Sequence, residues 1–98
     1  MTYPLNTQKA IALQPIRMDE KRNRFIHYTP ITWETRPAAN LDMYLRRLKA
    51  CGHIVEGKES PLAVDLLDEQ GNILDTILIN RKGFEYLRRK LKFCREQE

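Results

Sequence analysis

The sequence has little of the side-chain chemistry that enzymes and metal sites use. It contains a single serine, Ser60, two histidines, His27 and His53, and only four scattered glycines. Ser60 has no nucleophile-elbow motif around it, and no glycine cluster forms a phosphate-binding loop. Because the chain shows no combination of nucleophile, base and orienting group, we expect a protein without catalytic activity and without a cofactor.

Cysteine is also scarce, since Cys51 and Cys94 are the only two. Two cysteines are too few for the disulfide framework of a small secreted domain, so we expect a reducing compartment, the cytoplasm. Together with His53 they supply at most three metal ligands, whereas a structural zinc site usually has four. We therefore expect no metal, and we place both cysteines on the apolar faces of helices as small core residues.

Long apolar runs are absent as well. No stretch approaches the roughly 20 apolar residues of a membrane-spanning helix, and residues 1–14 lack the continuous apolar stretch of a signal peptide. With 42% apolar and 31% charged residues, the chain has enough hydrophobic side chains for one core. We expect a single domain over residues 1–98, in which residues 1–8 form an N-terminal arm.

The second half of the chain predicts a β-hairpin followed by a helix. Apolar residues alternate from Leu62 to Leu66, which is typical of a half-buried strand, and residues 73–79 supply the return strand. Gly71 in the intervening turn can adopt a positive φ. Asn80 is a predicted N-cap, and apolar residues then recur with helical spacing. That helical face consists of Phe84, Leu87, Leu91 and Cys94.

The first half predicts two strands in the same way. These are residues 9–17 and 24–33, with Met18–Asn23 as the turn between them. Pro15 and Pro30 lack an amide donor, so we expect them at sheet edges, bulges or strand ends.

A helix is predicted to begin near Pro37 and to be closed by Gly52 in the left-handed conformation. Its apolar face consists of Leu41, Tyr44, Leu45, Leu48 and Cys51. The element order is therefore β-β-α-β-β-α, and residues 9–52 and 61–97 form a pseudo-repeat. We expect an α+β fold with a mostly antiparallel four-stranded sheet, both helices packed on one face, and the other face open to solvent or a partner.

Charge is distributed unevenly along the chain, whose net charge is +4. Residues 81–98 hold seven cations and three carboxylates, whereas residues 56–75 hold one cation and six carboxylates. We expect a basic C-terminal helix beside an acidic hairpin. Either the two neutralise each other within the fold, or the helix offers its charge to a polyanion.

A second stripe runs along the predicted C-terminal helix, away from its apolar face. Its cations and rings alternate, in the order Lys82, Tyr86, Arg89 and Phe93, with Arg88 and Lys92 beside them. Outward-pointing rings can stack on bases while the cations neutralise phosphates, or they can anchor a protein partner. The alternative is that both rings pack under the N-terminal arm or against the other helix.

Another basic cluster lies at the tip of the first predicted hairpin and consists of Arg17, Lys21, Arg22 and Arg24. Such a tip can enter a nucleic-acid groove, although most are simply solvated. Our first hypothesis is a regulatory protein that binds nucleic acid through the helix stripe and the hairpin tip. The second is a protein-binding module or an inhibitor of a nucleic-acid-processing complex, of phage or plasmid type. A homodimer is compatible with either.

Overall fold

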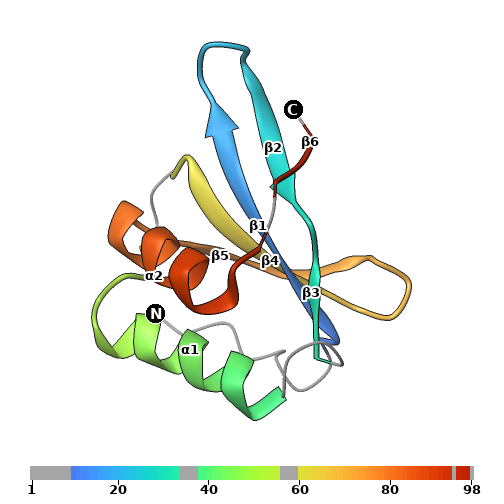
Figure 1. Ribbon diagram of the computed structural model, residues 1–98, viewed down its shortest axis with the longest axis vertical. Coiled ribbons are helices and arrows are strands. Elements are labelled where there is room, and N and C mark those ends of the chain that lie inside the picture. The colour runs from blue at the N-terminus through green and yellow to red at the C-terminus, as the bar shows by residue number, and fades with distance from the viewer. Residues whose placement is uncertain (1–9, 34–37, 56–59, 94, 98) are drawn as a thin grey trace.

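The computed structural model describes residues 10–33, 38–55, 60–93 and 95–97, and it confirms the predicted α+β fold (Figure 1). Its elements are β1 (Ala12–Asp19), β2 (Arg24–Tyr28), β3 (Ile31–Thr32), α1 (Ala38–Ala50), β4 (Leu62–Leu67), β5 (Ile73–Leu78), α2 (Arg81–Leu91) and β6 (Arg95–Gln97). The predicted order of two hairpins, each followed by a helix, therefore holds. The short strand β3 is the end of the predicted second strand, and β6 is an addition.

The strands form one antiparallel sheet in the order β5-β4-β1-β2-β6, with β3 paired to the start of β1. The first strands of the two hairpins, β1 and β4, lie side by side, and Leu13 pairs there with Leu66. At the other side of the first hairpin, β6 occupies the outer edge of β2. Both helices pack on the same face of the sheet, so the two halves share one core (Figure 1).

Pro15 lies within β1 and pairs with Val64 of β4 rather than standing at a strand end. A proline has no amide hydrogen to donate, so the neighbouring strand loses a hydrogen bond at this position. The neighbour is interrupted at that point, because β2 ends at Tyr28 and β3 begins only after Pro30. The Gln14 side chain donates from Nε2 to the Tyr28 carbonyl oxygen at 3.1 Å and so replaces the missing backbone donor. The single strand expected up to residue 33 is therefore two strands.

The local signals for turns and helix ends are confirmed. Asn80 caps α2, because its Oδ1 accepts a hydrogen bond from the Gly83 N–H at 2.8 Å. Gly52 follows α1 with a φ of 75°, and Gly71 lies in the turn of the second hairpin with a φ of 84°. In contrast, α2 is shorter than predicted. Its helical face was expected to run to Cys94, whereas the helix ends at Leu91 and Lys92 adopts the left-handed conformation with a φ of 53°.

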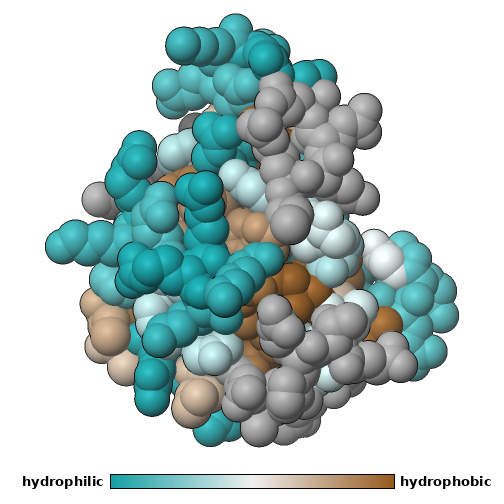
Figure 2. Space-filling view, viewed as in Figure 1, coloured by the Kyte–Doolittle hydropathy of each residue, from teal (hydrophilic) through white to brown (hydrophobic). Residues whose placement is uncertain are grey.

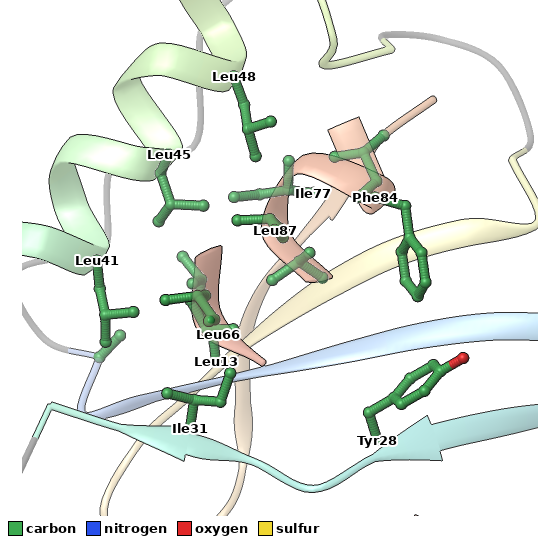
Figure 3. Close-up of a cluster of buried hydrophobic side chains, with 14 of the residues drawn as sticks. Leu13, Tyr28, Ile31, Leu41, Leu45, Leu48, Leu66, Ile77, Phe84 and Leu87 are labelled. Atoms are coloured by element: carbon green, nitrogen blue, oxygen red, sulfur yellow. The ribbon is translucent and has the colours of Figure 1, made fainter. Parts of the chain in front are cut away.

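The core lies between the sheet and the two helices (Figure 3). The helices contribute six of its buried side chains, namely Leu41, Leu45, Leu48, Phe84, Leu87 and Leu91. The prediction for Cys51 is wrong, since this residue is exposed. It lies one residue beyond the last residue of α1, and the chain has already begun its turn at Gly52. Cys94 lies outside the described residues.

The sheet face opposite the helices has buried side chains of its own. Three apolar residues there are at most 8% exposed although they lie outside the core cluster, namely Ala12, Ile16 and Leu67. Among them Asp65 is only 3% exposed and accepts a hydrogen bond from Thr76 Oγ1 at 2.8 Å. Burial raises the pKa of the Asp65 carboxyl above its ordinary value of 3.8, and this outweighs the Thr76 hydrogen bond and the nearby His27, which both lower it.

Gly83 lies in the first turn of α2, against the end of α1. A Cβ added to Gly83 would come within 2.9 Å of His53 Cβ and 3.3 Å of Leu48 Cδ2. The closest atom belongs to the base of a side chain, so it can move only with its backbone. The absence of a side chain at this position therefore lets α2 approach α1 and the residues that follow it.

We expect Gly83→Ala to destabilise the protein by about 1–3 kcal/mol, because an overpacked contact forces backbone shifts. In an exposed helix the same change would stabilise by about 1 kcal/mol through helix propensity. Urea unfolding followed by circular dichroism measures the free energy of unfolding. Arg89→Ala, at an exposed position of the same helix, is the control and should change it little. A stabilised Gly83→Ala variant would contradict the packing argument.

The raised pKa of Asp65 predicts that ionisation of this carboxyl destabilises the folded protein. The folded protein holds this proton more tightly than the unfolded chain, so the stability of the fold falls as the pH rises from the unfolded pKa through the raised folded pKa. Asp65→Asn should therefore raise the urea midpoint at neutral pH, since the amide is uncharged and can still accept from Thr76. Near pH 3, below the ordinary pKa of the carboxyl, both proteins should carry a neutral side chain and the difference should vanish. A variant that is less stable at neutral pH would contradict this account.

Candidate functional site

A groove of about 600 Å³ lies between the end of the first hairpin and α2. One wall consists of residues 17–21 and Tyr28 from the hairpin, and the other comes from residues 81–88 of α2. Pro61 and Leu62, at the start of β4, lie between the two walls. The groove has the size of a typical ligand pocket, about 300–1,000 Å³. This hairpin–helix groove joins segments that are far apart in the sequence (Figure 1).

The groove is lined by charges of both signs, with cations in the majority. The cations are Arg17, Lys21, Arg81 and Arg88, and the carboxylates are Asp19, Glu20 and Glu85. Two of these carboxylates face cations at long separations: 3.6 Å between Arg22 Nε and Asp19 Oδ2, and 3.8 Å between Arg88 Nη1 and Glu85 Oε2. Exposed ion pairs typically contribute only about 0–1 kcal/mol. The cations of the groove therefore keep most of their capacity to bind an anion.

Aromatic side chains lie beneath the charges. Tyr28 and Phe84 line the groove, with ring centroids 5.5 Å apart (Figure 3). Phe93 packs edge-on against both rings, at 4.8 Å and 5.6 Å. Phe93 is thus turned inward, contrary to the predicted outward stripe. The reason is the left-handed conformation of Lys92, which ends the helix and takes the next residue out of helical phase.

Tyr86 is also partly buried, and it packs against the core. Its ring lies 6.0 Å from that of Tyr44 on α1 in a T-shaped arrangement, and its hydroxyl is buried without a hydrogen-bond partner among the described residues. Lys90 Nζ lies 6.0 Å from the ring centroid. The prediction that both rings point outward is therefore wrong, and the alternative of packing against the other helix describes Tyr86. α2 is covered on two sides, by the sheet and by α1, so its buried face is wider than its leucines indicate.

The predicted basic site residues, in contrast, are all exposed. They are Lys21, Arg22, Arg24, Lys82, Arg88, Arg89 and Lys92. The hairpin group and the helix group meet at the hairpin–helix groove, where Lys21 stands on one wall and Arg88 on the other. Figure 2 shows hydrophilic residues over both the hairpin end and α2. Arg81 also lines the groove, although the sequence analysis did not single it out.

The turn of the acidic hairpin lies away from the basic helix, although the strands of the hairpin belong to the sheet on which α2 packs. The turn projects to the side of the molecule opposite α2 (Figure 1). The Asp68 carboxylate is engaged in that turn, where Oδ1 accepts from the N–H groups of Gln70 and Asn72 at 2.9 Å and 2.8 Å. Within the described part of the chain, the ion pair of α2 joins Arg88 to Glu85 of the same helix. The helix and the hairpin are neighbours as expected, since α2 contacts β4, but the described carboxylates of the turn lie away from the cations of α2. Glu56 and Glu59, which the prediction also counted, lie outside the described residues.

The exposed ring that the sequence analysis missed is Phe25, at the start of β2, which is 56% exposed. Ile26 and Tyr28 are buried toward the helices, so Phe25 and the exposed His27 lie on the opposite face. Alternation along these four residues does indicate that one pair faces out. One pair is Phe25 with His27 and the other is Ile26 with Tyr28. Because both pairs contain an aromatic ring, the pattern does not say which of them faces solvent.

Neither described helix is long and apolar enough to cross a membrane. Among the residues that the structure describes, no three His, Cys, Asp or Glu side chains are grouped so that they could hold a metal ion. No protein-family model, curated protein or solved structure matches the chain. Function is therefore inferred from the hairpin–helix groove, the exposed cations of α2 and the ring of Phe25.

Proposed function

We propose that this is a non-catalytic regulatory protein that binds nucleic acid in the hairpin–helix groove and along the exposed cations of α2. The observation that supports this most directly is the meeting of two basic segments, distant in sequence, around one concave surface. Phosphate contacts supply most of the affinity in nonspecific nucleic-acid binding. Arginine is well suited to them, because its planar guanidinium can donate two parallel hydrogen bonds to one phosphate.

The arrangement of the cations suits an extended backbone. Arg81 and Arg88 are seven residues apart on α2, which corresponds to about 10 Å along a helix axis. Arg17 and Lys21 stand opposite them on the hairpin wall. A strand laid along the groove meets cations on both sides. Beyond the groove, α2 and its C-cap add Lys82, Arg89 and Lys92.

The rings of Tyr86 and Phe93 are not part of the proposed contact surface. Their faces are already engaged with Tyr44 and with the pair of Tyr28 and Phe84. The carboxylates of the groove weaken its attraction for phosphate, but they can accept hydrogen bonds from the amino groups of bases. The proposed site therefore combines phosphate contacts with a limited capacity to contact bases.

The mixed charge of the groove favours one alternative, a protein-binding module or an inhibitor of a nucleic-acid-processing complex. A protein partner can present charges of both signs to the four cations and three carboxylates. A homodimer is compatible with either function. A cytoplasmic location belongs to the proposal too, because an exposed free thiol such as Cys51 suits a reducing compartment.

Removing two groove cations tests the proposal. We expect the unmodified protein to bind fluorescently labelled DNA or RNA at low salt, with an affinity that falls steeply as salt is added. Arg81→Gln combined with Arg88→Gln should weaken binding about tenfold or more and reduce the salt slope by about 2. Fluorescence anisotropy at several salt concentrations measures both quantities.

The matched control for that variant is Arg46→Gln combined with Arg47→Gln, which removes the same charge from exposed positions of α1. It should leave both the affinity and the salt slope nearly unchanged. Failure of the unmodified protein to bind duplex DNA, single strands or RNA at low salt would refute nucleic-acid binding. Capture of a partner protein that survives nuclease treatment would then support the alternative.

A further inference from the structure

The exposed face of β2 has a side-chain pattern that the groove does not explain. Phe25 and His27 lie two residues apart on the sheet face opposite the helices, and both are exposed. Side chains at this spacing stand about 6.6–6.8 Å apart along a strand. The partner strand sets Met18 opposite Phe25 and Ile16 opposite His27. The ring and the imidazole thus form a short row on one face of the first hairpin.

The exposed ring of Phe25 does not belong to a larger apolar surface. The other exposed large hydrophobic residues among those described are Ile11, Met43 and Ile73. Ile73 belongs to β5, at the opposite side of the sheet from β2, and Met43 belongs to α1. Ile11 precedes β1, at the far end of that strand from the Met18–Phe25 pair. A protein interface usually has a contiguous apolar centre, and no such centre surrounds Phe25 among these residues.

The segment that precedes Phe25 in the chain carries three cations. Lys21, Arg22 and Arg24 occupy the hairpin tip and are exposed. Isolated rings beside cations are the arrangement by which proteins hold unpaired bases, since a base can stack on a ring while its phosphates meet the cations. In a duplex the bases are stacked and paired within the helix, so their faces are not available to such a ring.

We infer that Phe25 and His27 form a stacking platform for unpaired bases and that the preferred partner is a single-stranded nucleic acid. This inference rests on the proposed function, because the hairpin–helix groove and the tip supply the phosphate contacts. The strand passes over the basic tip, with its backbone on the groove side and one or two bases against the opposite face of β2. The hairpin therefore contacts the ligand from both of its faces.

The test compares single-stranded and duplex ligands. A labelled RNA or DNA strand of about 12 nucleotides, within the site sizes of single-strand-binding folds, is titrated alone and after annealing to its complement. Phe25→Ala should weaken binding of the single strand roughly 5- to 150-fold, the effect of losing one stacked base. Binding of the duplex should stay the same. The salt slope should also stay the same, because no charge is removed.

Two variants keep the test specific. Phe25→Trp retains a stacking face and should retain the affinity for single strands, and its added indole should be quenched on binding. Ile73→Ala removes a hydrophobic side chain of similar exposure, 58% against 56%, from a strand outside the platform, and should have no effect. Urea unfolding checks that each variant remains folded.

The outcomes separate this inference from the proposed function. If Phe25→Ala binds single strands as tightly as the unmodified protein, or loses duplex binding to the same degree, the platform is refuted. If the unmodified protein binds duplex but not single strands, the platform is refuted while nucleic-acid binding stands. If it binds neither ligand at low salt, the proposed function itself fails, and the platform fails with it.

Discussion

The pairing of β1 with β4 is the contact on which the rest of the structure depends. Each of these strands begins a hairpin, and each hairpin is followed by a helix, so one pairing joins the two halves of the molecule. Its register sets Leu13 opposite Leu66 on the face where both helices pack. It also sets Arg17 opposite Leu62, which places the end of the first hairpin beside the start of β4. The hairpin–helix groove follows from that placement.

Features set by neighbouring residues were predictable from the sequence. The cap at Asn80 and the left-handed glycines Gly52 and Gly71 depend on local hydrogen bonding and backbone freedom, and the structure has them where expected. The apolar faces of both helices follow from helical periodicity, and their leucines are buried. Together these signals were sufficient for the element order and the fold class, because hairpins and amphipathic helices are local structures.

The candidate site was less predictable, because it depends on contacts between distant segments. Periodicity gives α2 one buried face, but α1 covers a second one, and Tyr86 packs there against Tyr44. Phe93 turns inward through a left-handed Lys92, a conformation that sequence patterns associate mainly with glycine. Pro15 is accommodated within β1 only because the neighbouring strand breaks at the same position. The basic residues were identified correctly as exposed, whereas their meeting around one groove required the fold.

The short strand β6 has a consequence for how the first hairpin can be used. An uncovered strand edge presents unpaired amide and carbonyl groups, which invite pairing with other chains. Because β6 pairs with β2, the backbone of β2 is already bonded on both sides over part of its length. Over that length, the strand that displays the most exposed aromatic ring of the first hairpin cannot act as a template for sheet growth. The described pairing includes His27 and Tyr28 but not Phe25, so the exposed ring of Phe25 comes directly before the part of β2 whose outer edge is covered.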